Sequence, residues 1–158
     1  MITRRLLILE RLGALAGVIQ KANGFDSDAG LRVYIGDAPE LGPSDPDFAI
    51  AIVPGDELAT EDGRISNTFP VEVQAIGKSG AVDAWINLEL LLGDLKRAIE
   101  LEDRTLGSIL KGVMKRGPTR TLERPPGHTT IGAGIFYTCP YVDEWGNPGY
   151  GVPPAEET

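Results

Sequence analysis

The sequence predicts an α+β fold: a mainly antiparallel β-sheet with an N-terminal helix and a central long helix packed on one face. Segments of helical and strand-like periodicity follow one another in blocks, in the order helix, three strands, two helices, two strands. Twenty glycines and twelve prolines among 158 residues favour strands joined by turns. A hydrophobic fraction of 42% suits one core, so residues 1–142 are expected to form a single domain and residues 143–158 a polar C-terminal tail.

The first element is expected to be an amphipathic helix over residues 3–22. Thr3 can cap its start, and Gly24 lies where it would end. The apolar run breaks at Glu10 and Arg11, which is too early for a signal peptide or a membrane span. We therefore expect no membrane partner. Steps of four, three and four place the apolar positions on one helical face: Ile8, Leu12, Leu15 and Ile19.

Three strands are expected next, over residues 31–35, 48–53 and 69–76. The first and third alternate between apolar and polar residues, and the second is a short apolar run. Residues 54–68 between the last two strands are polar and contain turn formers. We expect an antiparallel hairpin whose extended polar tip occupies this stretch.

The strongest helical pattern covers residues 82–101. Its core-facing stripe steps by three, four, three and four. A second, shorter helix is expected over residues 105–113, with Thr105 as its cap and Gly117-Pro118 as its stop. The expected stripe of the long helix is Trp85, Leu88, Leu92, Leu95 and Ile99. That of the short helix is Leu106, Ile109, Leu110 and Val113.

The final element is expected to be a hairpin with arms at residues 119–123 and 128–141. The single cysteine, Cys139, excludes an intrachain disulfide and suits a reducing compartment. The single histidine, His128, has no second histidine with which to form a metal site. Glycines 132 and 134 fall inside an alternating strand, where they predict a bulge or close backbone contact in place of a phosphate loop.

The charge distribution argues against a nucleic-acid-binding protein. The net charge of −8 opposes contact with phosphates. Five cations and only one anion, however, fall between Lys111 and Arg124. Such asymmetry indicates either a complementary partner surface or a solvated hairpin and helix end. This basic segment consists of Lys111, Lys115, Arg116, Arg120 and Arg124.

The residues provide little catalytic chemistry. Asp26 with Asp28, and Asp45 with Asp47, have the alternate spacing of a cation-binding loop, but neither pair continues into an EF-hand pattern. A complete Gly-x-x-x-x-Gly-Lys-Ser/Thr loop is missing, because Gly77-Lys78-Ser79 has Glu72 where the loop needs its first glycine, and no Gly-x-Ser-x-Gly motif is present. We therefore expect no enzyme activity, no cofactor and no resident metal.

The order of elements resembles that of tail terminator proteins of long-tailed bacteriophages and the related minor tail proteins. The resemblance covers most of the chain and is one of pattern, without a diagnostic peptide. Its matching stretches are residues 6–19, 48–52, 71–76, 84–99, 135–137 and the proline-ended 143–148.

The resemblance implies a structural virion subunit. Such a protein forms a homohexameric ring on the last ring of the tail tube, stops tube polymerisation and offers a docking surface to the head–tail connector. It would assemble in the host cytoplasm and reside at the head–tail junction, with DNA only passing through its lumen. The basic segment would then contribute to the subunit interface. The polar hairpin tip would contact the tube or connector through Asp56, Glu57, Glu61, Asp62 and Arg64, unless it is a plain solvated turn.

Two other functions remain open at this point. A head-closure or neck protein shares the α+β character and the ring-forming habit. A small metal-dependent enzyme or ligand-binding domain would use Asp26, Asp28, Asp45 or Asp47.

Overall fold

The computed structural model describes residues 1–38, 40–62, 64–123 and 127–149. It confirms the predicted α+β class, a mainly antiparallel sheet with the N-terminal helix and the central long helix packed on it, but the sheet has six strands where five were expected and there are two α-helices where three were expected. The expected turn residues Arg124, Pro125 and Pro126, and residues 150–158 of the expected tail, lie outside the described part. The elements in chain order are α1 (Arg4–Ala16), two 3₁₀ turns (Lys21–Asn23 and Ala29–Leu31), β1 (Val33–Ile35), β2 (Phe48–Pro54), β3 (Leu58–Asp62), β4 (Arg64–Lys78), α2 (Ala84–Glu100), β5 (Lys115–Thr121) and β6 (Thr130–Asp143).

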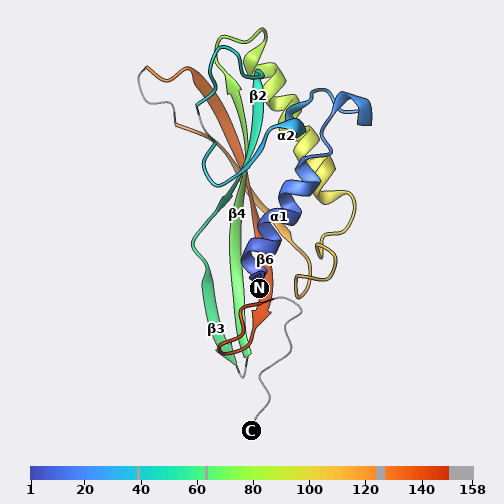
Figure 1. The fold of residues 1–158 in the computed structure, drawn as a ribbon, viewed down its shortest axis with the longest axis vertical. Helices are drawn as coiled ribbons and strands as arrows, with labels where there is room; N and C mark the ends of the chain where they lie inside the picture. Colours follow the sequence, from blue (N-terminus) through green and yellow to red (C-terminus); the bar gives the residue numbers. More distant parts are fainter. Residues whose placement is uncertain (39, 63, 124–126, 150–158) are drawn as a thin grey trace.

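The sheet is antiparallel except at one edge. Its strand order is β1-β2-β4-β6-β5, and β3 pairs with the far end of β4. The short strand β1 runs parallel to β2. The central strand β4 pairs with β6 from Ile65 to Lys78, and the two form a long twisted ribbon that continues past the helices (Figure 1). This ribbon and β3 make an extended arm at one end of the molecule.

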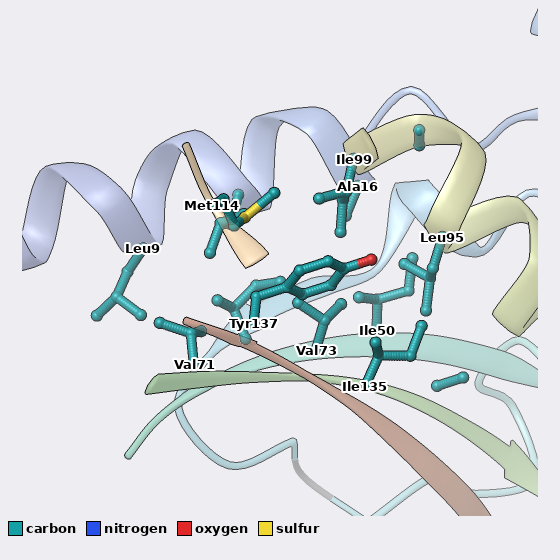
Figure 2. Packing of buried hydrophobic residues seen from close by; sticks show 14 of the residues in the cluster. Leu9, Ala16, Ile50, Val71, Val73, Leu95, Ile99, Met114, Ile135 and Tyr137 are labelled. Atoms are coloured by element: carbon teal, nitrogen blue, oxygen red, sulfur yellow. The ribbon is translucent and has the colours of Figure 1, made fainter. Parts of the chain in front are cut away.

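Both helices cover the same face of the sheet (Figure 1). The core lies between them and alternate residues of β2, β4 and β6, because successive strand residues point to opposite faces. Figure 2 shows Tyr137 of β6 at the centre of this core, beside Val73 and below Leu95 and Ile99 of α2.

Helix α1 begins as expected but ends earlier. The Thr3 hydroxyl accepts a hydrogen bond from the Leu6 N–H at 3.1 Å, which is the predicted cap. The helix stops at Ala16 instead of Ala22 because the loop at Gly30 packs on its end. The Gly30 N–H donates to the Ile19 carbonyl at 2.8 Å, so the chain bends there and a separate 3₁₀ turn follows.

Helix α2 contains most of the predicted stripe. Leu88, Leu92, Leu95 and Ile99 are buried, but Trp85 is 46% exposed, so its placement in the core was wrong. Trp85 lies on the same side of the helix as Leu92 and Ile99 but in the first turn, at the end of the packed region. The remaining core positions of this helix are Ala84, Leu91, Asp94 and Ala98.

The predicted short helix over residues 105–113 does not form. Leu106, Gly107 and Ser108 all have positive φ, between 52° and 72°, which a right-handed helix excludes. Asp103 organises a turn instead, because its carboxylate accepts hydrogen bonds from the Thr105 N–H and the Gly107 N–H, at 2.8 and 3.0 Å. Three of the predicted apolar residues of this segment are still buried, and Met114 takes the place expected for Val113.

Two segments that were expected to lie outside the sheet form strands. Residues 58–62 and 64–68, expected in the polar tip, form β3 and the start of β4. Gly117 and Pro118, expected to stop a helix, lie within β5 at a β-bulge. Sequence pattern missed both because few of these residues are buried, so apolar alternation does not mark them.

Candidate assembly surfaces

The extended arm is held to the start of α1 through Asp143 and the residues that follow it. Arg4 of α1 forms an ion pair with Asp143 of β6, with Nη1 and Oδ1 3.2 Å apart. Asn67 of β4 donates a hydrogen bond to the same carboxylate at 3.2 Å. The Arg4 N–H also donates to the Pro148 carbonyl at 3.0 Å, so the first residues of the expected C-terminal tail are bound to the helix start.

A second set of contacts fixes the segment that joins β2 to β3. The Tyr141 hydroxyl of β6 donates a hydrogen bond to the Glu57 carboxylate. Arg5 of α1 approaches Glu57 to 4.0 Å and stacks over the Phe69 ring at 4.3 Å from its centroid. Burial and the Glu57 carboxylate both raise the pKa of Tyr141, which keeps its proton available to this bond.

The expected contact residues of the hairpin therefore differ in role. Glu57 is held at the base of the arm, whereas Asp56 is exposed beside it. Glu61, Asp62 and Arg64 belong to β3 and β4 at the end of the arm, and their side chains lie outside what the structure describes.

The basic segment is spread over a loop and an edge strand. Lys111 precedes β5, and its N–H donates to the Pro140 carbonyl at 3.0 Å. Lys115, Arg116 and Arg120 lie on β5, whose residues are all exposed. Arg124 is outside the described residues.

Two of these cations have carboxylate partners in the same chain. Arg116 pairs with Glu100 at the end of α2, with Nε and Oε1 3.3 Å apart. The Tyr137 hydroxyl donates to the other oxygen of Glu100 at 2.8 Å, so this carboxylate connects β5, β6 and α2. Burial and Glu100 both raise the pKa of Tyr137.

The second pair lies on the sheet face opposite the helices. Arg120 binds Glu72 of β4 through two hydrogen bonds, 2.6 Å from Nε and 2.9 Å from Nη2. Gln74 donates a third hydrogen bond to Glu72 at 2.7 Å, and the Arg120 guanidinium lies 5.4 Å from the Phe136 ring centroid. Burial raises the pKa of Glu72, but the hydrogen bonds from Arg120 and Gln74 outweigh it and hold the pKa below its ordinary value.

The glycines of β6 make room for this cluster. A Cβ on Gly134 would lie 2.4 Å from a Glu72 oxygen, and one on Gly132 would lie 2.7 Å from the Leu122 side chain. The prediction of close contact at these glycines is therefore confirmed.

The four candidate metal-binding aspartates share a cavity only in part. Asp26, Asp28 and Asp47 line one cavity of about 560 Å³, whereas Asp45 is outside its lining. The Asp28 carboxylate accepts the Lys21 N–H at 2.8 Å, and Asp47 lies 3.9 Å from Lys78. Among the described residues, no group of three or more His, Cys, Asp or Glu side chains is arranged to hold a metal ion.

Sequence reasoning missed one exposed apolar surface. Its residues lie at and before the start of α2, and three of them step by four, a pattern that could have shown a second stripe. They are Val82, Trp85, Ile86 and Leu90.

A comparison of the sequence with protein-family models and with curated proteins finds no match. None of the described helices is long and apolar enough to cross a bilayer. What the structure defines is therefore a class: an α+β protein with one helix-covered sheet face, a projecting arm and a basic edge strand.

Proposed function

We propose that this chain is a structural subunit of the tail terminator type, which assembles into a ring, caps the phage tail tube and joins it to the head connector. The resemblance in the order of elements is the origin of the proposal. The observation that carries it is a pair of segments of opposite charge on opposite edges of the sheet, the acidic residues 56–62 and the basic edge strand β5. A closed ring needs two different patches on each subunit, since head-to-tail contacts are heterologous.

The projecting end of the arm is suited to the tube or the connector, and its acidic β3 edge to a neighbouring subunit. It extends beyond the helices, and its strands are joined by a continuous ladder from β3 through β4 to β6. Anchoring by Arg4, Arg5 and Tyr141 holds its base in one orientation. Edge residues of the arm such as Leu58, which is 72% exposed, are available to a partner.

Imaging and mass measurement of the purified protein test the ring. We expect negative-stain rings and a single oligomeric mass, and we expect the protein to bind the ends of tail tubes polymerised from the tube protein of the same genome. A protein that stays monomeric at high concentration and ignores tube ends would refute the proposal. Binding to portal rings in place of tubes would instead assign the chain to the head-closure or neck proteins.

Charge reversal tests the basic segment. In the described part of the chain Lys111 and Lys115 have no ion pair, so K111E/K115E should weaken assembly without disturbing the fold. The effect should shrink as salt rises, because screening weakens surface charges. The matched control is K21E, because Lys21 is exposed and lies far in sequence from the basic segment. Equal assembly of K111E/K115E and wild type at low salt would exclude this segment from the interface.

A further inference from the structure

Two edge strands on opposite sides of the sheet differ in charge. β3 contains two acidic residues and no basic one, with Asp56 and Glu57 just before it, whereas β5 contains three basic residues and no acidic one. Within the described ranges β3 pairs only with β4, and β5 only with β6. Each strand therefore has one row of backbone groups that no strand covers.

The free row of β5 can be assigned from its register. The Leu122 N–H donates to the Gly132 carbonyl at 2.9 Å, and Thr121 is opposite Ala133. Inward and outward hydrogen-bonding positions alternate in an antiparallel pair. The N–H groups of Thr119 and Thr121 therefore point away from β6, toward solvent.

The charges beside this free row remain accessible. Lys115 is exposed, and the side chains of Arg116 and Arg120 are 45% and 54% exposed although each also binds a carboxylate of its own chain. An arginine with several N–H donors can bind a second carboxylate while it keeps the first.

We propose that β5 of one copy pairs with β3 of the next copy, so that the sheets of neighbouring subunits join into one continuous sheet. The chain itself contains both complementary edges, which favours a second copy as the partner. Opposite charge favours β5 beside β3, and like charge disfavours β5 beside β5 or β3 beside β3. The remaining edge strand, β1, has only three residues and offers a shorter ladder.

This pairing is heterologous, because each copy uses one edge toward each neighbour. The inferred pairing depends on the proposed function in one respect only, the closure of a row of paired subunits into a ring. The same contact without closure would produce a filament.

Crosslinking between strand centres tests the pairing. Thr60 and Thr119 are exposed on β3 and β5, so T60C/T119C should form a ladder of covalent oligomers with a short bis-maleimide linker, which tolerates a difference of a residue or two in register. Each single variant should give dimers at most. The matched control, T60C/K21C, has the same number of introduced thiols and should give no ladder. The native Cys139 is buried and does not compete.

A proline substitution tests the backbone contact itself. T121P removes an outward N–H and leaves the inward bonds of β5, so assembly should need about a tenfold higher concentration. T121V keeps the N–H and a β-branched side chain, and should assemble as wild type does. Circular dichroism checks that both variants fold. If T121P is unfolded, the crosslinking result decides.

The outcomes separate this inference from the proposed function. Rings without a crosslinked ladder, or a folded T121P that assembles as wild type does, would overturn edge pairing and leave the ring intact. A crosslinked ladder from filaments that never close would support edge pairing and refute the ring. A protein that is monomeric throughout would refute both.

Discussion

Replacing Arg120 with alanine leaves a nearly buried carboxylate without its main partner. The Glu72 side chain is 5% exposed and that of Arg120 is 54% exposed. Two hydrogen bonds join them, and both disappear in R120A. The perturbation therefore removes one member of an ion pair on the sheet face opposite the helices.

The expected cost follows from this burial. Removal of one partner of a fully buried ion pair costs about 3–5 kcal/mol. Water reaches Arg120 and screens the pair, and Gln74 still donates to Glu72 in the variant, at 2.7 Å in the native protein. We therefore expect R120A to lower the free energy of unfolding by about 1–3 kcal/mol at neutral pH.

The lowered pKa of Glu72 determines how the stability difference between wild type and R120A changes with pH. The pKa of Glu72 is below its ordinary value of 4.5 in the folded protein. Such a group stabilises the fold fully above the unfolded pKa and loses this contribution as the pH falls through the folded pKa. The difference between wild type and R120A should be complete at pH near 7 and should shrink as the pH falls below about 4.5.

Urea unfolding followed by tryptophan fluorescence measures these differences at neutral and acidic pH. The control is Glu72→Gln, which keeps the shape of the side chain and removes its charge. In that background Arg120→Ala should cost much less than in the wild type. An R120A cost that is equal in both backgrounds and independent of pH would show that packing of the arginine stem, and not the ion pair, stabilises this face.

Three further predictions concern local contacts. Thr3→Ala removes the cap of α1 and should lower the free energy of unfolding by about 0.5–2 kcal/mol, while Thr3→Ser, which keeps the acceptor, should cost less; equal costs would exclude the cap. Tyr137→Phe removes the hydrogen bond to Glu100 and should cost about 0.5–1.5 kcal/mol in the same assay, less in a Glu100→Gln background; no change would show that the bond makes no net contribution. Burial raises the pKa of the Cys139 thiol to about 12, so a thiol reagent should label the native protein at pH 8 far more slowly than the urea-unfolded chain, and comparable rates would contradict its burial.

Much of the fold could be predicted because apolar periodicity reports burial. Strands β2, β4 and β6 and helix α2 contain the buried stripes that the pattern indicates. Where few side chains are buried, as in β3 and the first half of β5, the ladder consists of backbone hydrogen bonds that apolar periodicity does not mark, although the hairpin between residues 119–123 and 128–141 was predicted and β5 does pair with β6. The segment after α2 has buried apolar residues at helical spacing but folds as turns. The Asp103 carboxylate accepts hydrogen bonds from the backbone N–H groups of Thr105 and Gly107, and this local side-chain bonding competes with a helix.

For the candidate surfaces, only the local excess of acidic or basic residues could be predicted from the sequence. The acidic stretch and the basic segment are visible as charge, but pattern does not show that Arg116 and Arg120 bind Glu100 and Glu72, which are distant in sequence. Nor does it show that Glu57 contacts Tyr141 at the base of the arm.

The amino-acid sequence by itself determined the α+β class, the cap and core face of α1, and the helix-covered face of the sheet, because these follow from local periodicity and burial. Only the tertiary structure decided the strand order, the parallel edge strand β1, the length of the arm and the early end of α1 at Gly30. Each of these depends on hydrogen bonds between segments far apart in the chain, whose partners are chosen by packing and register and not by neighbouring residues.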